Sequence, residues 1–176
     1  MLGTSQDVTE RQKLIEQLQY NERLYKEAQS LAHLGNFSHN IVTGEITWAD
    51  EIYRIYGLEP QSLNKITLET IIGFVHPDDK ERAMREMNNA ITARTSYDSK
   101  YRVLLKDGTM KFIHRQAEWD PASNFNIMYG TVQDITRECL AEISDPREKR
   151  IHRKDSQHYA IADRILQYQH RQIHFY

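Results

Sequence analysis

The sequence predicts an α+β domain, in which a five-stranded antiparallel sheet carries short helices on one face and follows a long N-terminal helix. Three observations lead to this fold class. A charged, helix-forming stretch without Pro or Gly precedes the first strand. Two short alternating segments and several short helices follow it. Three further alternating segments, joined by tight turns, then complete the sheet as a meander.

Size and composition predict one soluble domain with helical segments at its ends. The chain has 176 residues, of which 39% are hydrophobic and 27% are charged. Its net charge of −2 gives no general attraction to nucleic acid or to a membrane surface, and no apolar run approaches the roughly 20 residues of a membrane span. The single cysteine, Cys139, fits a reducing compartment. We therefore expect a cytoplasmic segment that contacts neither nucleic acid nor membrane.

Residues 10–34 are predicted to form a signalling helix that dimerises, and Gly35 is expected to end it. The heptad spacing of a coiled coil joins Leu14, Leu18, Asn21, Tyr25, Ala28 and Ala32. The same spacing also fits an amphipathic helix that packs on its own domain, and each interpretation can hold for a different half of the helix. We expect a homodimer whose seam includes Leu14, Leu18, Tyr25 and Ala28.

The next segment is predicted to form a β-hairpin and a short helix. Residues 36–42 alternate polar and apolar side chains, a turn lies at 43–45, and 46–48 form the returning strand. Asp50 is placed to cap the helix that follows, which ends at Gly57.

Two more helices are expected before the sheet resumes. Residues 67–74 form a short one. His76-Pro77-Asp78-Asp79 then breaks the chain, and Asp78 or Asp79 is expected to cap a longer helix over 80–94.

The remaining strands are predicted from alternation and turn residues. Residues 97–105 alternate with tyrosine, Val and Leu on one face, and 106–108 turn the chain into a partner strand at 109–119. A second turn at 121–124 leads into the last strand, at 126–133.

The chain also contains an internal repeat. Gly3-Thr4-Ser5-Gln6-Asp7-Val8-Thr9 recurs as Gly130-Thr131-Val132-Gln133-Asp134-Ile135-Thr136. Both copies run from a strand-like Gly-Thr-x-Gln into a helix-prone charged stretch, and one whole structural unit separates them. We therefore predict that 1–9 is the tail of a preceding unit, 35–138 the domain and 139–176 a C-terminal helical connector or tail.

Four segments in this order carry a resemblance to a known family. They are Leu34-Gly35-Asn36-Phe37, the segment 47–60 with Ala49 where the family usually has Ser, Phe74-Val75-His76-Pro77-Asp78-Asp79, and Tyr101-Arg102-Val103 with Asp107-Gly108 and the second copy of the repeat. Together they resemble a PAS domain, of the PAS fold-3 type found in bacterial sensor histidine kinases and diguanylate cyclases. The resemblance implies a sheet that cradles short helices around a small cavity. It also implies that signals leave through Gly130, Asp134, Ile135 and Thr136 into the following helix.

A sensor core of this kind can hold a small ligand. The candidate lining is Trp48, Tyr53, Tyr56, Ile71, Phe74, Tyr101, Phe112, His114 and Met128, with Val103 and Trp119 beside them. The alternative is that these residues only fill the core, as aromatic residues commonly do.

No cofactor or metal is predicted. Because no cysteine precedes Cys139, the cysteinyl-adduct chemistry of flavin-binding PAS domains is excluded. Haem is not expected, since residues 80–94 contain no His and a lone His114 is weak evidence for a metal. His76, Asp78 and Asp79 fit a turn and helix cap better than a metal site.

No catalytic motif is present in the sequence, so the chain is not expected to be an enzyme. Adjacent PAS and output domains are the expected partners, in a parent that is a sensor histidine kinase or, second, a cyclic-dinucleotide enzyme. The competing class is a ligand-free spacer and dimerisation module. A basic run at 147–154 could also be a nucleic-acid arm, but such runs are usually solvated helix faces.

Overall fold

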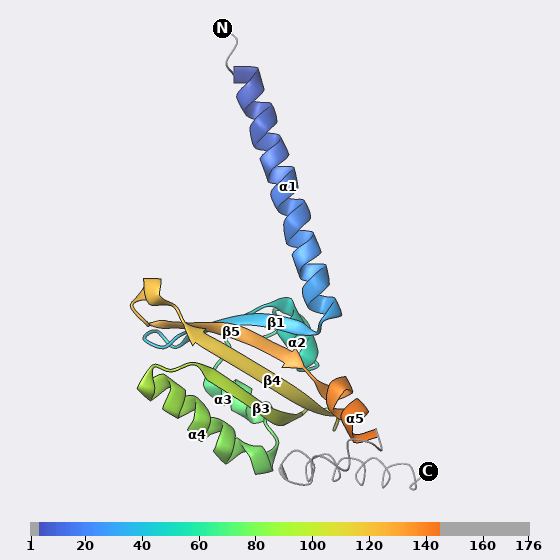
Figure 1. Ribbon diagram of the computed structural model, residues 1–176, viewed down its shortest axis with the longest axis vertical. Helices are drawn as coiled ribbons and strands as arrows, with labels where there is room; N and C mark the ends of the chain where they lie inside the picture. The colour runs from blue at the N-terminus through green and yellow to red at the C-terminus, as the bar shows by residue number, and fades with distance from the viewer. Residues whose placement is uncertain (1–3, 145–176) are drawn as a thin grey trace.

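One five-stranded antiparallel sheet organises the domain, in the strand order β2-β1-β5-β4-β3 (Figure 1). The computed structural model describes residues 4–144, with side chains for 10–142. The strands are β1 (Leu34–Asn40), β2 (Glu45–Trp48), β3 (Tyr97–Leu104), β4 (Met110–Trp119) and β5 (Ile127–Asp134). The predicted fold class, with an antiparallel sheet and a long N-terminal helix, is confirmed.

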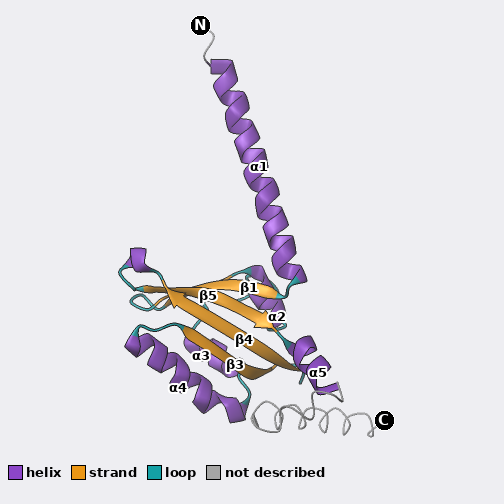
Figure 2. Ribbon diagram, viewed as in Figure 1, coloured by secondary structure: helices purple, strands orange, loops and turns teal. Residues whose placement is uncertain are grey.

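Helices precede, cover and follow the sheet (Figure 2). They are α1 (Thr4–Leu31), α2 (Asp50–Ile55), α3 (Leu68–Phe74), α4 (Pro77–Ala93), the 3₁₀ turn η1 (Pro121–Ser123) and α5 (Thr136–Ser144). Helix α1 extends away from the sheet, whereas α5 begins where β5 ends (Figure 1). The predicted connector after residue 144 lies outside the described residues.

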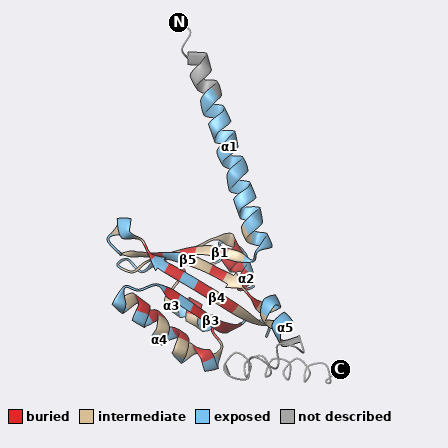
Figure 3. Ribbon diagram, viewed as in Figure 1, coloured by how far each residue is buried: buried red, intermediate tan, exposed pale blue. Residues whose placement is uncertain are grey.

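The core lies between the sheet and the helices α2 to α4 (Figure 3). Side chains that point inward from alternate positions of β1, β3, β4 and β5 meet those from the helices. The main cluster includes Phe37, Ile52, Ile55, Tyr56, Phe74, Met87, Tyr97, Tyr101, Val103, Ile113, Trp119, Met128 and Val132. A smaller cluster joins Ile46, Tyr53, Ile66 and Ile71.

The end of α1 differs from the prediction that placed it at Gly35. The helix ends at Leu31, and His33 takes the left-handed conformation with φ 48°. Gly35 lies inside β1, where a Cβ atom would come within 2.3 Å of the Ile52 side chain and 2.8 Å of the Ile52 nitrogen. This glycine therefore allows α2 to approach the sheet.

The two copies of the repeat adopt different structures. Gly130 to Asp134 lie in β5, which pairs with β1 and β4 on its two sides. The expectation of a strand in the first copy is wrong, because Thr4 begins α1 and the following residues continue that helix. Strand conformation depends on a hydrogen-bonding neighbour, and none of the described strands pairs with this segment.

Two predicted helix caps are also corrected. Asp50 is the first residue of α2, and the preceding Ala49 makes no side-chain cap. In α4 the cap is His76, whose Nδ1 accepts a hydrogen bond from the Asp78 amide at 3.3 Å. Asp79 does not cap the helix, because its carboxylate binds Arg102.

Candidate functional site

A charged side chain lies in the middle of the apolar core. Arg115 on β4 is only 4% exposed. Its guanidinium carbon lies 4.2 Å from the centre of the Phe37 ring and 5.7 Å from that of Tyr97. Its Nη1 lies 3.8 Å from the Met87 sulfur. Among the side chains of residues 10–142, no carboxylate lies within ion-pair distance of this guanidinium.

Tyrosine side chains lie beside this arginine. Ser99 pairs with Arg115 across β3 and β4, so Tyr97 and Tyr101 flank the arginine on the same face. Burial raises the pKa of Tyr97 to about 12. Burial and the neighbouring Tyr101 raise the pKa of Tyr56 well above its ordinary value. Both groups are therefore neutral hydroxyls at pH 7.

Two polar atoms in this region are buried without a hydrogen-bond partner among the described residues. They are the Arg115 Nε and the Tyr101 hydroxyl, which interacts with the neighbouring Tyr56 but makes no hydrogen bond of normal geometry. An unsatisfied buried donor costs about 1–3 kcal/mol, and more when it is charged. Buried polar groups in folded proteins are almost always paired, so this exception marks the region as a candidate site.

Most of the predicted lining residues lie in the core. Trp48 stacks on Tyr56 with ring centres 5.2 Å apart, and Tyr56 contacts Phe74 at 5.0 Å. Tyr101 and Met128 belong to the same cluster. Tyr53 and Ile71 lie in the smaller neighbouring cluster, which Trp48 links to the main one.

Phe112 and His114 lie elsewhere, on the opposite face of β4 from the core. His114 Nε2 is 2.8 Å from the Asp98 carboxylate on this outer face. Sequence reasoning therefore selected the wrong face of the strand and missed Ile113 and Arg115, which point inward. Counting alternate residues back from Trp119 would have found both, because side-chain directions alternate along a strand.

The predicted signal exit is a compact set of hydrogen bonds between β4, β5 and α5. The Thr136 amide donates to Asp134 Oδ1 at 3.0 Å, and the Thr136 hydroxyl also donates to this carboxylate. The same hydroxyl accepts a bond from the Phe112 amide at 2.9 Å. Lys111 Nζ lies 3.1 Å from Asp134 Oδ2. The start of α5 is thus bonded to the neighbouring strand as well as to its own.

Two residues on either side of this network complete the exit. Ile135 is 9% exposed, and its amide donates to the Phe112 carbonyl at 2.9 Å. Gly130 lies upstream, where a Cβ atom would come within 1.9 Å of the Gln116 carbonyl oxygen of β4. Only glycine allows β4 and β5 to approach this closely here.

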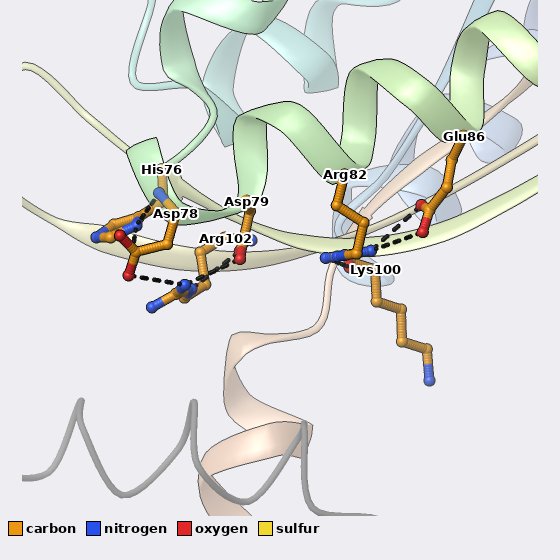
Figure 4. A network of polar contacts seen from close by, with 7 residues as sticks. All are labelled: His76, Asp78, Asp79, Arg82, Glu86, Lys100 and Arg102. Carbon is orange, nitrogen blue, oxygen red and sulfur yellow. Dashed lines mark hydrogen bonds and ion pairs between the residues drawn. The ribbon is translucent and has the colours of Figure 1, made fainter.

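A second polar network ties α4 to β3 (Figure 4). Arg102 donates to Asp79 from Nε, from Nη2 and from its backbone amide, each at 2.9 Å. Burial opposes ionisation of Asp79, but these contacts outweigh it and lower the pKa. Farther along, Arg82 bonds the Lys100 carbonyl at 2.8 Å, and Glu86 accepts from the Ser99 hydroxyl at 2.6 Å. The Asp79 carboxylate is therefore occupied by an arginine.

The residues of the predicted dimer seam lie in two different environments, some exposed far from the sheet and one bonded to the domain. Leu14 and Leu18 are 67% and 69% exposed. Tyr25 lies near the domain, and its hydroxyl accepts a hydrogen bond from the Asn36 amide group at 3.1 Å. Ala28 is exposed on the last turns of the helix. None of the helices within residues 4–144 is long and apolar enough to cross a membrane.

The chain is similar in sequence to known proteins. Residues 45–132 match the PAS fold family. A blue-light-activated histidine kinase of Brucella ovis is 26% identical over 112 residues, which cover 64% of this chain. The match spans only 22% of the length of that relative.

Solved structures share the fold. A sensory box histidine kinase/response regulator from Burkholderia thailandensis has a TM-score of 0.55 and 26% identity, covering 74% of this chain and 95% of that one. The N-terminal domain of a diguanylate cyclase with a PAS/PAC sensor from Marinobacter aquaeolei has a TM-score of 0.53 and 19% identity, covering 60% and 97%. The family match and the five-stranded sheet agree with each other, and this chain belongs to the PAS fold family.

Proposed function

We propose that this chain is the cytoplasmic sensory and relay segment of a bacterial sensor histidine kinase. It detects a small ligand in its core and passes the resulting change through Asp134, Ile135 and Thr136 to the following helix. The observation that carries this proposal is the Thr136 hydroxyl, which bonds the backbone of β4 and the carboxylate of β5 at once. The proposed role is sensory and not catalytic.

The contacts supply a physical route for the signal. The inward side chains of β4 include Ile113 and Arg115. Ile113 directly follows Phe112, whose amide bonds the Thr136 hydroxyl at the exit. A shift of β4 against β5 changes the distance between the Phe112 amide and the Thr136 hydroxyl. Because the same hydroxyl helps to hold the first turn of α5, the helix responds by changing its angle or its stability.

The ligand in this proposal is not a flavin adduct or a haem. Cys139 lies in α5, outside the core, and burial raises the pKa of its thiol. His114 lies on the outer face of the sheet and is engaged by Asp98. The light activation named for the Brucella relative is therefore not carried over to this chain.

Dimerisation through α1 completes the proposed arrangement. Leu14 and Leu18 expose apolar surface at heptad spacing, and Ile15 and Leu24 of the same helix are exposed as well. A second copy of the chain would cover this surface in a parallel coiled coil. Two domains held side by side would then act on a paired C-terminal helix.

The experiment for the relay uses Asp134→Ala and Thr136→Ala in a full-length protein that carries this domain. We expect autophosphorylation of the kinase to lose its response to stimulus, while the isolated chain stays folded and its melting temperature falls by only a few degrees. The control is Thr131→Ala, whose side chain lies on the face of β5 that points away from the core. An unchanged response in both exit variants would exclude this route.

The second candidate function is a ligand-free spacer and dimerisation module. The exposed seam of α1 favours it, because dimerisation alone accounts for that surface. Native mass spectrometry of the purified chain distinguishes the two functions. A dimer with a bound small molecule supports sensing, whereas a dimer of bare chains that binds no added compound supports the spacer.

A further inference from the structure

Arg115 differs from the other buried charged side chains of the described chain. The Glu51 carboxylate is paired with Arg54 at 3.0 Å, and Asp79 with Arg102 at 2.9 Å. Arg115 is equally buried, yet its guanidinium contacts two aromatic rings and a thioether and pairs with no carboxylate of residues 10–142. A buried charge without a counter-ion is strongly unfavourable, and the ring contacts leave its Nε without a partner.

We propose that the core binds a small organic monocarboxylate, whose carboxylate group pairs with the Arg115 guanidinium and with the hydroxyl of Tyr101. This inference rests on the proposed sensing function and names the chemical class of the ligand. Both polar atoms without a partner, the Arg115 Nε and the Tyr101 hydroxyl, receive one in this arrangement.

The charges of the groups around Arg115 favour a ligand with one negative charge. Burial and, secondarily, Arg115 lower the pKa of the nearby His39, so this side chain is neutral at pH 7. Tyr56 and Tyr97 are neutral too, for the reasons given above. The Glu86 carboxylate, which also acts on Tyr97, is bonded to Ser99 and paired with Arg82 at 3.2 Å. The Arg115 guanidinium has no such pair, so a single negative charge balances it. The planar fork of the guanidinium matches a carboxylate with two parallel hydrogen bonds.

The side chains of the core near Arg115 are apolar, so the part of the ligand beyond its carboxylate should be apolar as well. The Phe37 ring lies 4.2 Å from the guanidinium carbon, and Tyr56, Phe74 and Met128 belong to the same apolar cluster as Phe37. Met87 contacts the guanidinium through its sulfur, and its three rotatable bonds let it turn aside without a change in the backbone of α4. A carboxylate can then occupy the place of the thioether beside Nη1.

The test uses benzoate, phenylacetate and hexanoate, each with the amide of the same shape as an uncharged partner, and inorganic phosphate as a third arm. The chain is first refolded to remove any molecule retained from the host. We expect at least one carboxylate to raise the melting temperature. We also expect it to shift the ¹H–¹⁵N signal of the Arg115 Nε–H, which has no partner in the free chain. Amides and phosphate should do neither.

Two variants assign the effect to this residue. In Arg115→Gln the carboxylate affinity should fall roughly 30-fold or more, as expected when one partner of a buried charge pair is removed. Arg94→Gln is the matched control, because it removes an arginine that stacks on Trp119 at the surface, 4.5 Å from the ring centre. Should the Gln variant fail to fold, the Nε–H signal of the unaltered chain still decides the question.

Several results would overturn the proposal. Binding of amides or phosphate in place of the carboxylates removes the charge assignment, but leaves a ligand-sensing core. Equal binding to Arg115→Gln moves the site away from this arginine. If none of the compounds binds, the monocarboxylate is wrong, and a bound neutral molecule in native mass spectrometry would still support sensing.

Discussion

The Asp134 amide donates a hydrogen bond to the His33 carbonyl oxygen at 3.1 Å. This bond joins His33, two residues after the end of α1, to Asp134, the last residue of β5. The neighbouring pair, Leu34 and Gln133, continues the contact as the first rung of the β1–β5 ladder. These contacts connect the end of α1 to the start of α5 through the backbone of β1 and β5, without passing through the core.

Loss of the Thr136 hydroxyl should loosen the start of α5. Thr136→Val keeps the shape of the side chain but leaves the Phe112 amide without its acceptor. We expect a loss of about 1 kcal/mol in the free energy of unfolding and faster hydrogen exchange at the Phe112 amide. Thr131→Val, on β5, should change neither quantity. Equal protection of Phe112 in the two variants would contradict the assignment.

The Asp79–Arg102 pair should matter to stability, and its contribution should depend on pH. Asp79→Asn leaves the buried Arg102 with only the longer 3.5 Å contact to the half-exposed Asp78, so we expect a loss of about 3 kcal/mol at pH 7 in urea unfolding. The exposed pair of Glu81 and Arg85 offers the control, because Glu81→Gln should cost less than about 1 kcal/mol.

The sign of the pH dependence follows from the lowered pKa of Asp79 in the folded chain. Its ion pair stabilises the fold above the unfolded pKa of about 3.9 and is lost as the pH falls through the lower folded value. The stability difference between the wild type and Asp79→Asn should therefore stay constant from pH 7 to about pH 5 and narrow below about pH 4. A difference that widens in acid would be inconsistent with this pair.

Replacement by alanine should lower the stability of the chain at two glycines and raise it at a third. Gly130→Ala and Gly35→Ala place a Cβ atom 1.9 Å and 2.3 Å from neighbouring atoms, so each should cost about 3 kcal/mol or more. Gly73 lies inside α3 with nothing within 4 Å of the added atom. Gly73→Ala should therefore stabilise the chain by about 0.5–1 kcal/mol. Thermal unfolding of the three variants tests this order, and a stable Gly130→Ala would refute it.

Replacement of Arg115 by methionine should stabilise the ligand-free chain. The uncompensated charge costs several kcal/mol in effective desolvation, whereas its contacts with Phe37 and Tyr97 return about 2 kcal/mol at most. We expect Arg115→Met to gain about 1–2 kcal/mol in urea unfolding of refolded protein. A less stable variant would mean that Arg115 serves the fold through its ring contacts.

Charge in the N-terminal half of α1 should separate the proposed dimer. The double variant Leu14→Glu with Leu18→Glu places four like charges in the seam of two helices, so the mass measured by light scattering should fall to that of one chain. Tyr20→Ser, at an outer position of the same helix, is the control. A dimer that survives the double variant would have to form through another surface.

Much of the fold could be read from local patterns. Alternation and turn residues placed β1 to β5 within a few residues, because strand faces and tight turns depend on neighbours in the chain. Thr67 was correctly placed at the start of α3, where its hydroxyl accepts from the Thr70 amide at 3.1 Å. The end of α2 near Gly57, which has φ 68°, also agrees with the prediction that this glycine closes the helix.

The contacts that distinguish this domain were decided by residues far apart in the sequence. Asp79 lost the role of a helix cap because Arg102, on the following strand, binds its carboxylate more strongly than a backbone amide could. Gly35 was expected to end a helix, but the approach of Ile52 gave it a place in β1. The inward direction of Arg115 followed from the register of β4 against β3. Local pattern was thus sufficient for the order of the strands and helices and for the family resemblance. Which polar groups are buried, and which of them find partners, depended on contacts between distant segments, because burial and pairing are set by packing.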